Sequence, residues 1–192
     1  KYYDKGFVSL FSKKRLTKLS EAINKTVLVR YEQGRGDIFQ FSRYLILLIN
    51  KNIKVIFWSP KILEGLLGSI DERIKIITKL DSDTHYDFFC VLLDLPEIFE
   101  TKPETIPSFK QYLYPSKKLI EKWANKLNRN KINIGIFWQG STKPVDKGRS
   151  FKLENFSKIS KIKNIQLISL QKNIGSEQLI SFKKDNNILD FT

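Results

Sequence analysis

The 192-residue chain contains no methionine, one cysteine and one histidine. Cys90 has no partner for a disulfide within the chain, and its apolar surroundings, FFCVLLDL, favour a small buried side chain over a reactive thiol. His85 has neither cysteines nor an acidic cluster beside it in sequence, so it offers no ligand set for structural zinc. We therefore expect no metal site.

Long apolar runs are also missing from the sequence. None approaches the roughly 18 to 20 consecutive apolar residues that a membrane span requires. The first residues, KYYDKGFVSLFSKKR, lack the apolar stretch of a signal peptide. We expect a cytoplasmic protein whose 41% hydrophobic residues suffice for the core of one domain or of two small ones.

Acidic residues are few relative to basic ones, 20 Asp and Glu against 34 Lys and Arg, which gives a net charge of +14. Such a balance attracts anions, including sugar nucleotides and an anionic membrane surface. A nucleic-acid partner is an alternative supported by the charge alone. However, the lysines are spread along the chain among many isoleucines and asparagines, and neither a zinc-finger spacing nor an RNA-binding aromatic signature is present. We expect no nucleic-acid partner.

The first half of the chain alternates between helical and extended patterns. Apolar residues at helical spacing in residues 13–24 predict a short lead-in helix. Four short apolar runs predict strands: 26–31, 53–59, 74–79 and 87–93. Helices are predicted between the first three runs, at 37–48 and 60–70. This alternation favours a doubly wound α/β fold, with a Rossmann-like parallel sheet in residues 25–113.

The second half of the chain begins a further α/β unit. A proline-containing loop at 100–108 ends the first pattern, and a helix is predicted in the linker at 114–130. Residues 131–192 then predict strands at 132–138 and 165–170, with helices near 153–160 and 176–184. These strands are too few for a complete sheet of this class. We therefore expect a partial second Rossmann-like domain.

The turn after the first predicted strand contains the tripeptide Arg-Gly-Asp at 35–37, known as a cell-adhesion signal. Adhesion would need an exposed loop on a secreted protein, and the sequence indicates neither secretion nor disulfides. The alternative is that Gly34 and Gly36 allow the turn from strand to helix, at the edge where open α/β sheets bind ligands. The glycines match neither the full dinucleotide fingerprint nor a phosphate loop.

Several motifs occur together from Thr26 to Gln171: VRYEQGRGDIFQFSRYLILL, IPSFKQYL, KKLIEKWANKLN, INIGIFWQGSTK, GRSFKLENF and LISLQK. In order and spacing they resemble the glycosyltransferase family 9 (heptosyltransferase-like) region that follows tetratricopeptide repeats in bacterial proteins. The resemblance implies the GT-B architecture of two Rossmann-like domains, a sugar nucleotide bound in the C-terminal half, and no metal or other cofactor. The chain departs from the family in having Gly-Arg-Gly for Gly-Leu-Gly, and in lacking the C-terminal stretch that would hold the donor nucleotide.

The resemblance implies that Asp37 is the base that takes the proton from an acceptor hydroxyl during inverting, metal-independent transfer. Asp37 is also a suitable N-terminal helix cap, and one residue could have both roles. Gln33, Gly34 and Gly36 would form the acceptor-side loop.

The donor-phosphate side would consist of residues that follow the two predicted strands of the second unit: Gln139, Gly140, Ser141, Lys143, Arg149 and Gln171. Lys143 could neutralise charge on a leaving diphosphate, and the guanidinium of Arg149 suits phosphate. The alternatives are a solvated Lys143 and a Gln171 that caps the following turn.

The leading hypothesis from the sequence is therefore sugar transfer from a nucleotide-sugar donor to a hydroxyl of a glycan or protein acceptor, by an enzyme that is incomplete in this chain. The rival hypotheses are a non-catalytic α/β binding module that lacks the donor site and a basic nucleic-acid-binding protein.

Overall fold

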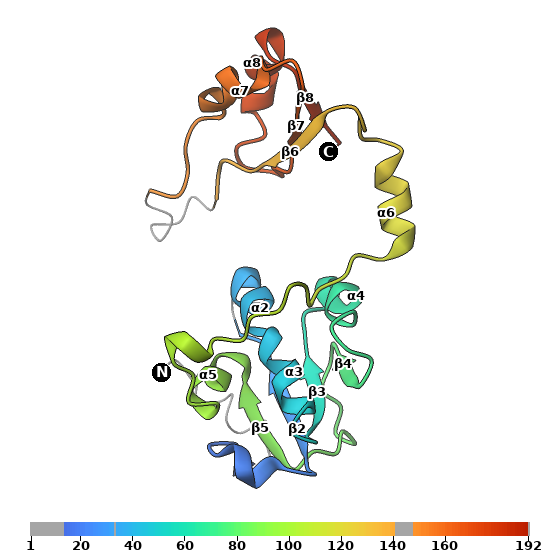
Figure 1. Cartoon of the computed structure of the whole chain (residues 1–192), viewed down its shortest axis with the longest axis vertical. Helices are drawn as coiled ribbons and strands as arrows, with labels where there is room; N and C mark the ends of the chain where they lie inside the picture. The colour runs from blue at the N-terminus through green and yellow to red at the C-terminus, as the bar shows by residue number, and fades with distance from the viewer. Residues whose placement is uncertain (1–13, 33, 141–147, 192) are drawn as a thin grey trace. The chain divides into compact units, whose positions relative to one another are not determined.

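The computed structural model describes residues 14–32, 34–140 and 148–191, and the chain divides into two compact units, Lys1–Ser116 and Lys117–Thr192 (Figure 1). Each unit contains a sheet in which every neighbouring pair of strands is parallel. The predicted α/β class with Rossmann-like parallel sheets is thus confirmed. The boundary between the units falls inside the segment 114–130.

The first unit has a five-stranded sheet in the order β1-β5-β2-β3-β4. Its strands are β1 (Lys14–Arg15), β2 (Thr26–Arg30), β3 (Lys54–Trp58), β4 (Ile74–Ile77) and β5 (Phe88–Val91). The central strand β2 pairs with β3 on one side and with β5 on the other. Its buried residues are β-branched or aliphatic, as expected for a strand that packs on both faces.

The connections of the first unit place helices on one face of the sheet. The chain passes from β2 through α2 (Arg35–Phe41) and α3 (Arg43–Ile49) to β3, and through the short helices η2 (Lys61–Leu63) and α4 (Glu64–Leu67) to β4. The link from β4 to β5 contains no helix in residues 78–87. After β5 follow η3 (Leu92–Asp94), α5 (Leu95–Ile98) and η4 (Pro103–Thr105).

Two clusters of buried side chains cover the two faces of this sheet. The larger cluster joins Val27 and Val29 of β2 to residues of α2, α3, α4 and α5, such as Leu45 and Leu95. The smaller one, on the opposite side of the same strands, consists of Leu28, Ile56, Tyr86 and Phe89. In the described part of the unit the helices therefore pack on one face, and the segment before β5 covers the other.

The second unit has the three-stranded sheet β6-β7-β8. Its elements are α6 (Lys117–Ala124), β6 (Ile132–Ile136), η6 (Leu153–Phe156), α7 (Ser157–Ser160), β7 (Ile165–Ser169), α8 (Gln178–Asp185) and β8 (Ile188–Asp190). Its core contains Trp138, Leu167 and Ile188 from the sheet side and Leu179 and Phe182 from α8.

Two elements differ from the sequence prediction. The lead-in helix at 13–24 is wrong: Lys14–Arg15 forms a strand beside β5, and only Leu19–Ala22 is helical, as a 3-10 turn. The amide of Leu16 donates to the Phe89 carbonyl at 2.8 Å, because extending the sheet satisfies more backbone groups than an isolated short helix could. Strand β8 was not predicted. Among the described residues no helix has the length and apolarity to cross a membrane.

Candidate functional site

The strand order of the first sheet defines a topological switch point between β2 and β5. The chain proceeds from β2 to β3 and β4 in one direction and then returns to the other side of β2 to form β5. In open α/β sheets ligands bind at such a point, outside the carboxyl ends of the strands. The described residues that follow β2 and β5, at 31–32, 34–37 and 92–94, therefore border the candidate site.

Asp37 lies in the first turn of α2 and is exposed. Its predicted role as N-terminal cap is wrong, because the helix begins at Arg35, the capping position is Gly34, and no side chain forms a capping hydrogen bond. The Asp37 carboxylate instead lies over Gly34, where a Cβ atom would run into Oδ2. An acidic side chain in a first turn is stabilised by the partial positive charge of the helix start. Asp37 is thus an accessible carboxylate that no capping bond occupies.

The two glycines of this turn have different roles. Gly34 has φ +95°, a left-handed conformation that non-glycine residues rarely adopt. Gly36, in contrast, lies within the first turn of α2, and a Cβ there would meet no atom within 4 Å. The expectation that both glycines make the turn is therefore corrected: only Gly34 is required by the backbone. Gln33 lies outside the described residues.

Glu32 is a candidate residue that the sequence analysis did not identify. Burial raises the pKa of its carboxyl, the negative charge of Asp94 raises it further, and a hydrogen bond from the Leu93 backbone partly opposes both effects. Its Oε2 is shielded from solvent and has no hydrogen-bond partner among the described residues. A carboxyl in this state is better suited to hold a proton than an exposed one. Neither the burial of Glu32 nor its neighbouring charge could be inferred from the sequence. Asp94 is 62 positions away and becomes a neighbour of Glu32 only when β5 pairs with β2.

Other charged residues at this edge are held by the protein itself. The Arg30 guanidinium lies 5.1 Å from the ring centroid of Trp58 and 5.9 Å from that of Tyr31, and burial lowers its pKa. Asp94 accepts two hydrogen bonds from Arg15, at 2.6 and 3.2 Å, and one from the Val91 amide at 3.1 Å. These contacts fix the ends of β2 and β5. Glu32 and Asp37 are then the carboxyl groups at this edge that can accept or donate a proton.

In the second unit, Gln171 follows β7 and is 1% exposed. Its Oε1 accepts from the amides of Trp138 and Gln139 at 3.2 and 3.1 Å. Its Nε2 donates to the carbonyls of Gln139 and Ile174 at 2.9 and 2.6 Å. Both groups of the amide are therefore used to join the ends of β6 and β7, which is the capping alternative rather than a contact to phosphate.

The other donor-side candidates lie along the segment that follows β6. Gln139 Oε1 accepts from Gln178 at 3.0 Å, and the Gly140 amide donates to the Ser150 hydroxyl at 3.1 Å. That bond brings Arg149, which is exposed, toward the same edge as Gln139 and Gly140. Ser141 and Lys143 lie outside the described residues.

The positive charge is concentrated in the second unit. Residues 117–192 contain 16 Lys and Arg but only 6 Asp and Glu, a net charge of +10 out of the total of +14. The lysines are distributed along the whole chain, whereas most of the acidic residues lie in the first unit. An anionic ligand would therefore be attracted mainly to the second unit.

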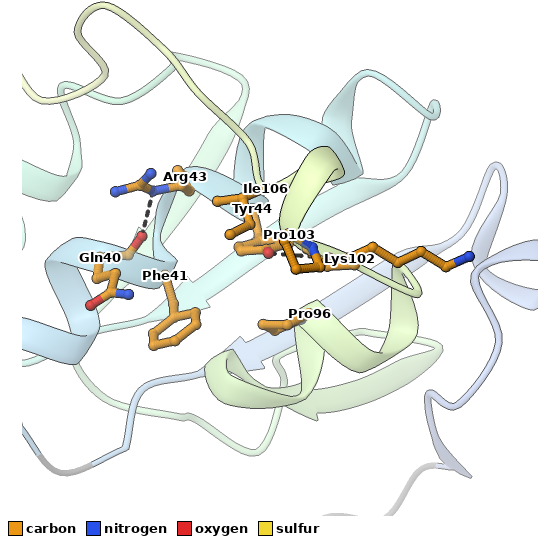
Figure 2. A pocket seen from close by; sticks show the side chains of 9 residues that line it. Gln40, Phe41, Arg43, Tyr44, Pro96, Lys102, Pro103 and Ile106 are labelled. Carbon is orange, nitrogen blue, oxygen red and sulfur yellow. Dashed lines mark hydrogen bonds between the residues drawn. The ribbon is translucent and has the colours of Figure 1, made fainter.

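A cavity of about 340 Å³ lies in the first unit, between α2, α3 and the segment that contains η4, and Figure 2 shows the side chains that line it. Arg43 lines it, but its guanidinium already donates to the Gln40 and Pro107 carbonyls, at 2.7 and 3.0 Å. The Tyr44 hydroxyl donates to Thr101 at 3.1 Å. The Lys102 ammonium points away from the other lining side chains (Figure 2). The polar groups in this cavity thus maintain the structure and do not converge on a ligand.

Within residues 14–32, 34–140 and 148–191, no group of three or more His, Cys, Asp or Glu side chains could hold a metal ion. Comparison of the chain with protein-family models, with curated proteins and with solved structures gives no match.

Proposed function

We propose that the chain is glycosyltransferase-like and takes part in the transfer of a sugar from a nucleotide-sugar donor to a hydroxyl group of a glycan or protein acceptor in the cytoplasm. The sequence motifs that resemble glycosyltransferase family 9 suggest this chemistry. Two successive α/β units with parallel sheets are compatible with the two-domain architecture of that family. The proposal involves no metal, since the chemistry requires only a base and stabilisation of a leaving diphosphate.

The observation that carries the proposal is the position of Asp37. Its carboxylate is exposed, lies over Gly34, and follows the central strand β2 beside the topological switch point. An exposed carboxylate at this edge can accept the proton of an acceptor hydroxyl, because neither a capping bond nor an ion pair with a described residue occupies it. Asp37 is therefore the proposed base.

On the donor side, the proposal relies on Arg149 and on the backbone near Gly140. Arg149 is exposed and carries the planar donor group that matches a diphosphate. The positive charge of residues 117–192 would raise the local concentration of an anionic donor. Gln171 is not part of this donor set, since its amide is fully used within the protein. Ser141 and Lys143 stay as predictions, and so does a peripheral contact with an anionic membrane.

A second candidate is a non-catalytic α/β binding module. The observation that favours it is that the polar side chains brought together in the second unit, Gln139, Gln171 and Gln178, hydrogen-bond within the protein. A module of this kind lacks the donor site, so it would neither bind a nucleotide sugar tightly nor turn it over. The two candidates therefore differ in donor binding and turnover and not in fold.

The test is an assay of nucleotide-sugar binding and turnover with a panel of nucleotide sugars and simple acceptors. Asp37→Asn should reduce turnover by about 10²- to 10⁴-fold while leaving donor affinity within about twofold. Asp83→Asn, which removes an equally exposed carboxylate from the loop before β5, is the matched control and should retain full turnover. Acceptor binding with neither nucleotide-sugar binding nor turnover would favour the second candidate, whereas full turnover by Asp37→Asn would contradict the proposed role of Asp37.

A further inference from the structure

A cavity of about 390 Å³ lies within the second unit, between α6 and one face of its sheet. Gly135 of β6 and Ile168 of β7 are paired in register and line this cavity. Their neighbours along the strands, such as Ile136 and Leu167, pack with α8 on the opposite face. The cavity is therefore on the sheet face that α7 and α8 do not cover.

The cavity is open because α6 contacts the sheet loosely. No residue of α6 is buried, and its Trp123 meets Phe191 edge to face, with ring centroids 5.3 Å apart. Gly135 contributes no side chain to the floor, where a Cβ atom would lie 2.8 Å from Leu170 Cδ1. Leu127 lines the cavity as well. The result is an aliphatic and aromatic space whose volume lies within the range of roughly 300 to 1,000 Å³ found for small-molecule sites.

The charges around the cavity are positive. Lys172 is the charged residue in its lining, and Lys126 Nζ lies 5.0 and 5.5 Å from the ring centroids of Trp123 and Phe191. Asp190, which precedes the lining residue Phe191 in sequence, is paired with Lys183 at 3.0 Å. An apolar ligand with a negatively charged end would therefore satisfy both the walls and the rim.

We propose that this cavity binds a single-chain amphiphile with an anionic head, of the kind represented by a medium-chain fatty-acid carboxylate. The chain would lie on Gly135 and Ile168, between Trp123 and Leu170, and the carboxylate would face Lys172. The two aromatic rings of the cavity, Trp123 and Phe191, already pack edge to face against each other among aliphatic walls, which does not suit the base stacking through which single-stranded nucleic acid binds. The volume suits one short chain better than a two-chain lipid. This site is independent of the proposed sugar transfer.

Calorimetric titration of the 192-residue chain with monomeric decanoate, below its micelle concentration, tests the site. Affinity should increase by about fourfold for each methylene from octanoate to decanoate, as expected for burial of apolar surface. Decanol, which has no charge, should bind more weakly than decanoate, and decyltrimethylammonium should bind more weakly still. Equal affinity for decanoate and decyltrimethylammonium, or no dependence on chain length, would overturn the proposal.

Two variants locate the binding on the protein. Lys172→Gln should weaken decanoate binding by about two- to fivefold, which is the effect of losing one partly exposed charge pair. The same variant should not change the affinity for decanol. Lys184→Gln, an exposed lysine on α8, is the matched control and should change neither. Gly135→Leu fills the floor and should abolish binding of both ligands, with circular dichroism as the check of folding. Equal effects of the two lysine variants, or binding to phosphatidylglycerol vesicles without binding of monomeric decanoate, would contradict the assigned pocket.

Discussion

Replacing Gln171 with methionine removes four hydrogen bonds from the second unit and changes side-chain volume little. The Trp138 amide then has no acceptor in a residue that is only 1% exposed, and a buried unsatisfied donor costs about 1 to 3 kcal/mol. The partners at Gln139 and Ile174 are closer to solvent, so water can replace the lost bonds and their net contribution is about 0.5 to 1.5 kcal/mol. We expect a total loss of about 1.5 to 4.5 kcal/mol.

Urea denaturation followed by tryptophan fluorescence measures this loss, because Trp58 reports on the first unit and Trp123 and Trp138 report on the second. The second unit should unfold at a lower urea concentration, while the first unit keeps its midpoint. Gln171→Glu separates the two halves of the amide: it retains acceptors for the Trp138 and Gln139 amides but cannot donate to the two carbonyls when ionised. An unchanged midpoint for the methionine variant, combined with weaker nucleotide-sugar binding, would refute the structural role and return Gln171 to the donor site.

Three further predictions concern the first unit. Gly34→Ala should destabilise it by about 1 to 3 kcal/mol because of the positive φ and the contact with Asp37. Gly36→Ala should be neutral or stabilise by up to about 1 kcal/mol, and thermal melts of the pair show whether the turn has been assigned correctly. Glu32→Gln should be more stable than the parent protein at neutral pH. Since the folded protein raises the pKa of Glu32, it binds the proton more tightly than the unfolded chain does, and stability is lost as pH rises through the folded pKa. The urea midpoints of the parent protein and of Glu32→Gln, measured from pH 4 to pH 8, should thus diverge with rising pH. Parallel curves for the two proteins would contradict the raised pKa of Glu32. Cys90 is fully buried, which raises the pKa of its thiol, so Ellman's reagent should modify it only as the protein unfolds.

The strands of the first sheet could be predicted because both of their faces are buried. Val27–Val29 and Val55–Phe57 are continuous apolar runs rich in β-branched side chains, and this pattern is available without knowing what packs against it. The three-residue strand β8 shows no such run, since Ile188 and Leu189 are followed directly by an acidic residue. Its pairing with β7 depends on the rest of the sheet.

The candidate site was predictable in position but not in geometry. The glycine turn after β2 indicated the edge of the sheet at which the candidate site is proposed. The start of the helix depends on the positive φ angle of Gly34, which the sequence does not reveal. The prediction that Asp37, three positions later, caps the helix was therefore wrong, because the capping position is Gly34. Similarly, the sequence placed Gln171 at the end of a strand, but only the pairing of β6 with β7 turns its amide toward the Trp138 backbone.

The strand order β1-β5-β2-β3-β4 has a consequence for the way the first unit acquires its structure. Strand β2 can pair with β3 as soon as residue 58 has been synthesised, but its other edge stays exposed until residues 88–91 follow. Strand β1 precedes both, yet it can join the sheet only through β5. An open edge on a central apolar strand is a site for association with other chains. The first unit should therefore fold slowly for its size, and the interval before β5 docks is the period in which the nascent chain is most prone to aggregate.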